Sequence, residues 1–139
     1  MAVADELGAG WLADVAHGAL ARALAGTARA DAARRPEIAR QLRRFILDAL
    51  ERDTLQFALV IIDGVAVFVW EHDPRTAYLL AAIYRRAWTV SSLLPPEAVG
   101  GIDRAELAAL DTRASITTDR EAIALALSAL DGYLTAEPG

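Results

Sequence analysis

The sequence predicts an all-α protein of about five to six helices, packed as antiparallel hairpins. Three observations predict this class. Apolar residues make up 55% of the chain, against about 45–50% in typical domains, and most of the excess is Ala and Leu, which favour helix. Apolar residues recur at three- and four-residue spacings along most of the chain, which is the helical period. Helix-start signals stand at Asp73-Pro74 and at Thr118-Asp119-Arg120-Glu121.

Two amphipathic helices are expected in the first part of the chain. The first covers about residues 5–30, and its apolar stripe consists of Leu7, Trp11, Leu12, Val15, Leu20 and Leu24. The second begins at Pro36, because a proline in the first helical turn loses no hydrogen bond. Its apolar stripe consists of Ile38, Leu42, Phe45, Ile46, Ala49 and Leu50. Each of these helices should bury one face only.

The segment 55–71 admits two interpretations. The pair Asp63-Gly64 stands among many β-branched residues, which is a strong signal for a β-hairpin. On a helix, however, Gln56, Asp63, Gly64 and Glu71 fall within about 100° of one another, whereas on strands they show no alternation. We therefore favour a helix that is apolar nearly all round, as expected of the central member of a helical stack. The alternative is an α+β fold with a central hairpin at 55–71.

A further helix should begin at Asp73-Pro74, with Asp as N-cap and Pro at the first helical position. Its expected core positions are Ala77, Leu80, Ala81, Tyr84 and Trp88. The pairs Pro95-Pro96 and Gly100-Gly101 then mark a loop.

Two capping signals predict the remaining helices. Asp103-x-x-Glu106 resembles a capping box, and Thr118-x-x-Glu121 is a clearer one. The apolar positions of the last helix run Ile123, Leu127, Leu130 and Leu134.

Length, charge and composition limit the classes of protein to which the chain can belong. A chain of 139 residues is one domain by length, so residues 1–139 are expected to form a single helical domain. The net charge of −5 argues against a nucleic-acid surface, which is usually basic. Cysteine is absent, which fits a reducing cytoplasm, and Asp5 and Glu6 stand where a secretory signal carries positive charge. The longest apolar stretch, 57–70, is too short for a bilayer. We expect a cytoplasmic protein that binds neither nucleic acid nor membrane.

The stretch from Ile62 to Ala87 resembles a tetratricopeptide-type helical hairpin. More specifically, the chain is similar to the C-terminal helical-repeat region of LuxR-family and MalT-like bacterial regulators and of antibiotic-regulatory (STAND) ATPases. The matching residues are Asp73, Pro74, Ala77 and Leu80, then Leu94-Pro95-Pro96-Glu97, then Thr117 to Ile123. His72 departs from the pattern, because a glycine usually stands at that turn. The resemblance implies a regulatory sensing or scaffolding module without the ATPase or the DNA-binding part.

No catalytic, metal or cofactor site is evident in the sequence. The cluster Glu71-His72-Asp73 contains metal-type ligands, but a zinc site needs three or four ligands from different elements, and His17 is the only other histidine. A turn with Asp73 as N-cap explains the same residues. Phosphate-binding loops and nucleophile elbows are not found. We expect a protein that is not an enzyme and that needs no cofactor.

Two sets of residues are candidates for binding. Arg40, Arg43 and Arg44 belong to a concentrated arginine patch that offers bidentate guanidinium groups to an acidic partner, although a solvated helix face explains them as well. Tyr78 and Trp88 are large aromatic residues, and helical repeats often bind peptides or small effectors through exposed aromatic side chains.

The leading hypothesis is a non-enzymatic helical-repeat module for protein–protein interaction or self-association. Because 55% apolar residues exceed what one small core normally hides, we expect a homo-oligomer, most simply a two-fold dimer. The alternative is a sensor that binds a small ligand in an apolar pocket between helices.

Overall fold

The fold is all-α and consists of antiparallel helices, as the sequence predicts. The computed structural model describes residues 32–51, 55–88, 92 and 94–135, so the helix expected over residues 5–30 lies outside the described residues. Within these ranges there is no strand. The helices are α3 (Arg35–Glu51), α4 (Leu55–Val69), α5 (Pro74–Trp88), α6 (Arg104–Ile116) and α7 (Asp119–Thr135), with short 3-10 turns η1 (Ala32–Arg34) and η2 (Pro96–Val99).

Segment 55–69 is one continuous helix, so the hairpin alternative is wrong. Asp63 and Gly64 lie in the middle of α4 and are buried rather than placed in a turn. The buried Asp63 carboxylate accepts a hydrogen bond from the Ser92 hydroxyl, which lies after α5. Asp63 would signal a turn if only its neighbours in sequence were considered. Here its carboxylate is buried, and a hydrogen bond from a distant segment satisfies it. Trp70, expected within this helix, lies just beyond its end and is half-buried.

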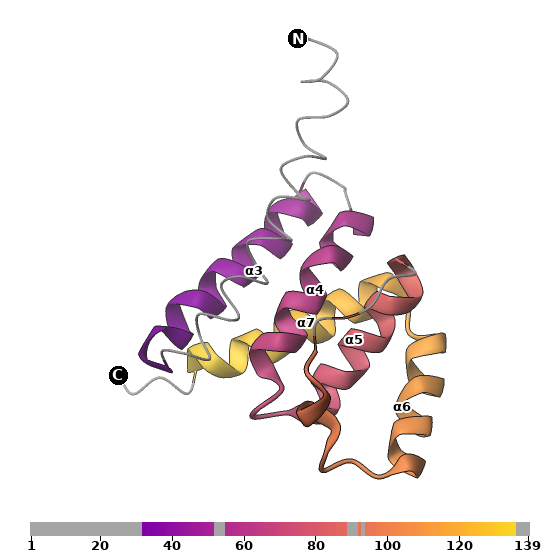
Figure 1. The fold of residues 1–139 in the computed structure, drawn as a ribbon. Helices are drawn as coiled ribbons and strands as arrows, with labels where there is room; N and C mark the ends of the chain where they lie inside the picture. The colour runs from indigo at the N-terminus through magenta and orange to yellow at the C-terminus, as the bar shows by residue number, and fades with distance from the viewer. Residues whose placement is uncertain (1–31, 52–54, 89–91, 93, 136–139) are drawn as a thin grey trace.

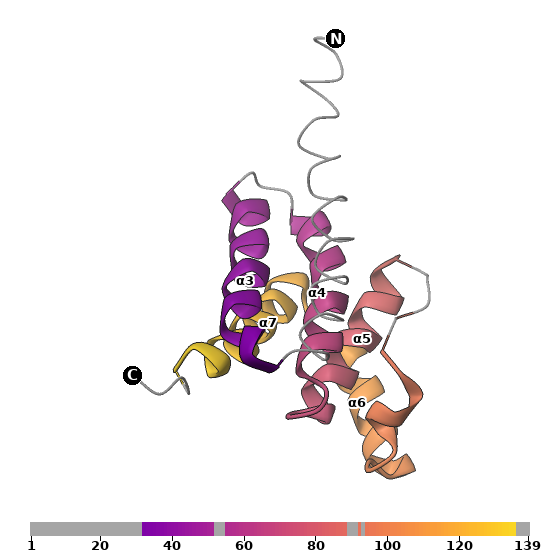
Figure 2. The same ribbon diagram turned by 60° about the vertical axis from the view of Figure 1, so that its left-hand side comes forward.

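Helix α4 is the centre of the molecule. It packs against α3, α5 and α7, which surround it in both views (Figures 1 and 2). Nearly all of its described side chains are buried, with Val67 half-buried. This burial explains why its sequence is apolar all round instead of amphipathic.

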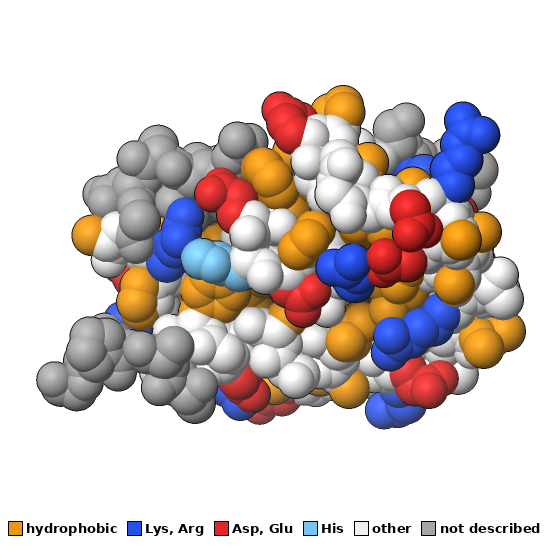
Figure 3. Space-filling model, turned by 90° about the horizontal axis from the view of Figure 1, so that it is seen from below, with side chains coloured by type: hydrophobic (Ala, Val, Ile, Leu, Met, Phe, Trp, Pro, Cys, Tyr) orange, Lys and Arg blue, Asp and Glu red, His pale blue; other side chains and the backbone are white. Residues whose placement is uncertain are grey.

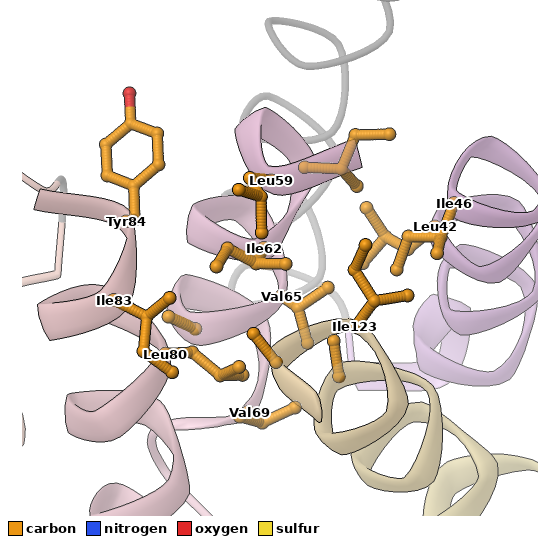
Figure 4. Packing of buried hydrophobic residues seen from close by; sticks show 14 of the residues in the cluster. Leu42, Ile46, Leu59, Ile62, Val65, Val69, Leu80, Ile83, Tyr84 and Ile123 are labelled. Atoms are coloured by element: carbon orange, nitrogen blue, oxygen red, sulfur yellow. The ribbon is translucent and has the colours of Figure 1, made fainter. Parts of the chain in front are cut away.

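The core forms where α3, α5 and α7 meet α4. Figure 4 shows Leu42 and Ile46 of α3, Leu80 and Ile83 of α5, and Ile123 of α7 on different sides of α4. All five side chains are at most 2% exposed. The apolar stripes predicted from the sequence for α3, α5 and α7 thus all face α4.

Helix α7 closes the bundle by packing against α3 as well as α4. Across this junction, Arg43 Nε donates to Asp131 Oδ1 at 3.0 Å. In an open stack of repeats each unit contacts only its neighbours in sequence. The contact between the last helix and the first described one gives this chain a closed core instead.

The predicted helix-start signals are present. Asp73 Oδ1 accepts from the Thr76 backbone N–H at 3.1 Å, and Pro74 follows as the first residue of α5. The box before α7 is reciprocal: Glu121 N–H donates to Thr118 Oγ1, and Thr118 N–H donates to Glu121 Oε1. These caps satisfy backbone N–H groups that have no partner inside the helix.

Helix α6 lies at the outside of the bundle, on the far side of α5 from α4 (Figure 1). Ala114 is its one buried residue. Asp103 caps its N-terminus through the Glu106 N–H at 2.8 Å, but the Glu106 side chain pairs with Arg75 instead of completing a capping box. No helix in the described ranges is long and apolar enough to cross a membrane.

Candidate binding surfaces

A shallow groove runs along the outer face of α3 and ends at the last turn of α7. Its volume is about 610 Å³. It is lined by Glu37, Arg40, Gln41, Arg43, Arg44, Leu47, Asp48 and Leu134. The seven α3 residues belong to one face because they follow the three- and four-residue helical spacing. We call this feature the arginine groove.

The arginine groove combines charged rims with apolar side chains. Arg40 and Arg44 are exposed, whereas Arg43 is half-buried and held by Asp131 of α7. Leu47 is 38% exposed. Leu47 and Ile116 are the only exposed large hydrophobic residues in the part of the chain that the structure describes. An exposed leucine beside guanidinium groups favours a partner that is both acidic and apolar.

The structure brings together three of the five residues proposed from the sequence. Arg40, Arg43 and Arg44 line one groove, as a concentrated patch on a helix predicts. The apolar members, Leu47 and Leu134, were not proposed as binding residues. Leu47 follows Arg40 and Arg44 at spacings of seven and three, so periodicity places it on their face. The contribution of Leu134 depends on the packing of α7.

Tyr78 belongs to a different surface, between α5 and α6. It is half-buried, and its hydroxyl donates to Asp111 Oδ1 at 2.8 Å. The Arg85 Cζ lies 5.7 Å from the centre of its ring. Burial is the main cause that raises the Tyr78 pKa, and the Asp111 hydrogen bond adds to it while Arg85 opposes it. The side chain of Trp88, the last residue of α5, lies outside the described residues.

Polar side chains of α5 attach α6 to the bundle. Arg75 Nη2 donates to Glu106 Oε1 at 3.0 Å, and this contact lowers the pKa of Glu106. Tyr78 adds its bond to Asp111 of α6. Arg86 donates to the carbonyl oxygens of Ser115 and Thr117 at 3.0 and 3.1 Å, at the C-terminal end of α6. Helix α6, with one buried residue, is therefore held by these polar contacts together with the packing of its half-buried Leu110.

The Glu71-His72-Asp73 sequence forms the turn between α4 and α5. Arg35 Nη1 and His72 Nε2 lie 2.8 Å apart, and Arg35 Nη2 lies 3.8 Å from Glu71 Oε2. Figure 3 looks onto this end of the bundle and shows the histidine beside an arginine, with hydrophobic side chains next to it. Asp73 serves as the N-cap of α5. Among the described residues, no three His, Cys, Asp or Glu side chains gather as metal ligands would.

The Tyr133 side chain lies behind this turn. Its ring centre is 4.6 Å from that of Phe68 and 5.5 Å from that of His72. The hydroxyl is buried and has no hydrogen-bond partner among the described residues. Burial is the main cause that raises its pKa to about 12. Buried polar atoms without partners are rare in folded proteins.

Comparison of the chain with protein-family models, with curated proteins and with solved structures finds no match.

Proposed function

We propose that the protein is a non-enzymatic helical module that binds a segment of a partner protein in the arginine groove. The observation that carries the proposal is the exposed Leu47, which lines the same groove as the exposed Arg40 and Arg44. An apolar anchor beside cationic side chains suits an amphipathic segment with acidic flanks. A regulatory role agrees with the resemblance to helical-repeat regions of bacterial regulators.

The size of the groove indicates what kind of segment fits. The α3 residues that line it run from Glu37 to Asp48, a length of about 16 Å at 1.5 Å per residue. A partner helix of about three turns matches that length. Leucines at positions i, i+3 and i+7 of such a partner helix lie along one face. Three arginines and two acidic residues line the groove, and Arg43 is paired with Asp131 of α7. The exposed Arg40 and Arg44 are the cations that an acidic segment would meet, and salt should weaken its binding there.

The test is fluorescence anisotropy with a labelled 14-residue probe, a design of about four helical turns. The probe peptide carries leucines on one helical face and glutamates elsewhere. We expect Arg44→Glu and Leu47→Asp each to raise the dissociation constant at least about tenfold, a loss of about 1.4 kcal/mol. Arg120→Glu is the matched control, because Arg120 is an exposed arginine outside the groove. Equal binding of a scrambled peptide, or equal loss with the control variant, would contradict the proposal.

Self-association through the same groove is the second form of this proposal. Leu47 is specific support, because it is one of two exposed large hydrophobic residues in the described ranges and two copies joined there would cover it. Light scattering at micromolar concentration tests this form. A dimer mass that Leu47→Asp reduces to that of a monomer supports it, and a monomer mass for the unchanged chain excludes it.

A further inference from the structure

A second hollow lies between α5 and the proline turn that precedes η2. Its volume is about 260 Å³. Its apolar lining consists of Tyr78, Ala81, Leu94, Pro95, Pro96 and Val99. At about 30 Å³ per water molecule, this volume corresponds to roughly nine waters. It therefore suits a compact molecule of about ten non-hydrogen atoms and is separate from the arginine groove on α3 and α7.

A buried polar contact holds the walls in place. The Ser92 hydroxyl, which also lines the pocket, donates to the buried Asp63 carboxylate of α4 and accepts from the Leu94 backbone N–H at 3.0 Å. Pro95 and Pro96 fix the backbone that follows, because the proline ring restricts rotation about φ. The pocket is thus largely formed in advance. The Ser92 donor is already used, so this part of the wall favours an apolar group over one that needs a hydrogen-bond donor.

One cation stands at the pocket. Arg85 is exposed, lines the hollow and lies over the Tyr78 ring. The Tyr78 hydroxyl is bonded to Asp111 of α6, which fixes the ring on which the guanidinium rests. Arg85 makes no ion pair with a carboxylate of the described residues, in contrast to Arg75 on the same helix. A guanidinium group binds carboxylates strongly because two parallel N–H groups match the two oxygens.

We propose that this pocket binds a small carboxylate with an aromatic or branched apolar body. The body occupies the space between Ala81, Val99 and the prolines, and the carboxylate pairs with Arg85. The Tyr78 ring contributes to both parts, as an apolar wall and as the support for the guanidinium. This site is independent of the arginine groove, since none of its lining residues is shared with that surface.

The experiment uses phenylacetate as the probe and phenylacetamide as its neutral counterpart of nearly equal shape. Each is titrated into isotope-labelled protein at neutral pH, and backbone amide shifts are followed by NMR. A ligand of this size is expected to bind with a dissociation constant of about 0.1–10 mM, given the limits on binding energy per atom. Saturable shifts should centre on the amides of Tyr78, Ala81 and Val99, with nuclear Overhauser contacts from the probe to the Tyr78 ring.

The charge contact is tested by Arg85→Gln. We expect this variant to weaken phenylacetate binding by about fivefold, the size of a solvent-exposed ion pair, and to leave phenylacetamide binding unchanged. Arg120→Gln, an exposed arginine that does not line the pocket, is the control and should bind both probes as the unchanged chain does. Equal affinity for the two probes in the unchanged chain overturns the proposal, as does the absence of saturable shifts. Shifts confined to α3 would place the carboxylate in the arginine groove and also overturn it.

Discussion

Helices α4 and α6 are of similar length, 15 and 13 residues, but different kinds of interaction hold them in the bundle. Every described side chain of α4 is buried or half-buried, and three helices surround it. Only Ala114 of α6 is buried, and polar side chains of α5 connect α6 to the bundle. Salt does not weaken apolar burial by screening, whereas exposed charged contacts weaken as salt screens them. Helix α4 therefore determines whether the chain folds, whereas α6 can loosen at small cost to the free energy of unfolding.

The largest expected effect comes from shortening a side chain of α4. Ile62 is fully buried, so Ile62→Ala should lower the free energy of unfolding by about 2–5 kcal/mol, because it removes apolar contacts and leaves a cavity. Leu110→Ala is the matched change in α6, where the side chain is half-buried, and it should cost less than half as much. Urea denaturation measures both. Equal losses would show that α6 belongs to the same cooperative core.

A smaller effect, an increase in the free energy of unfolding, is expected from a substitution at Tyr133. The buried Tyr133 hydroxyl has no hydrogen-bond partner among the described residues, and such a group costs about 1–3 kcal/mol. Tyr133→Phe should therefore stabilise the protein, by about 1 kcal/mol at the low end of that range. Tyr78→Phe is the matched control and should destabilise it, because it loses the bond to Asp111. A lower melting temperature for Tyr133→Phe would reveal a hydrogen bond to that hydroxyl.

Alkaline pH provides a second readout of Tyr133. Its folded-state pKa is raised to about 12, whereas tyrosine in an unfolded chain titrates near about 10. The unfolded chain therefore releases its proton first, so stability is retained below about pH 10 and falls as the pH rises towards 12. Tyr133→Phe should flatten this fall. Part of the slope should persist, because the Tyr78 pKa is raised as well.

The N-cap of α6 tests how far this helix depends on local chemistry. Asp103→Ala removes the acceptor for the Glu106 N–H and should cost about 0.5–2 kcal/mol. With only one buried residue to hold α6, the loss should appear as faster hydrogen exchange within that helix. Exchange in α4 should be unchanged. Equal acceleration in both helices would mean that α6 does not open separately.

The smallest effect is expected for the exposed pair between Arg75 and Glu106. Arg75 lowers the Glu106 pKa, so the stabilisation is present at neutral pH and is lost as the pH falls through the folded-state pKa of Glu106. Glu106→Gln should cause a slight loss of stability in dilute buffer. About 0.5 M NaCl should abolish the difference from the unchanged chain, because salt screens exposed charges. A loss that persists in salt would point to packing instead.

Much of the fold follows from local sequence signals. Asp73-Pro74 and the box at Thr118 predict helix starts because a cap depends on residues within one turn. The all-round apolar pattern of segment 55–69 likewise predicts a central helix. Neither the Ser92 bond to Asp63 nor the closing contact of α7 on α3 was predicted, because each joins residues far apart in sequence.

The candidate surfaces were likewise predicted only where their residues lie close together in sequence. Arg40, Arg43 and Arg44 share one helix, so their spacing alone places them close together on its surface. Arg85 was not proposed as a binding residue, because the proline turn beside it has no sequence relation to α5 that spacing reveals. Helix α6 attaches to the face of α5 that α4 leaves uncovered, and which face that is depends on how α4 and α5 pack. Sequence periodicity identifies faces, but it does not say which faces meet.

The closing contact between α3 and α7 has a consequence for synthesis of the chain. Arg43 and Asp131 are separated by 88 positions, so the helix that completes the core around α4 is made long after α3 and α4. Domains form during synthesis from the N-terminal end, and segments that wait for distant partners expose apolar surface meanwhile. Nascent chains that end before α7 should therefore leave one flank of α4 open and bind chaperones. Emergence of α7 from the ribosome, rather than emergence of α4, should mark the moment at which the chain becomes resistant to protease.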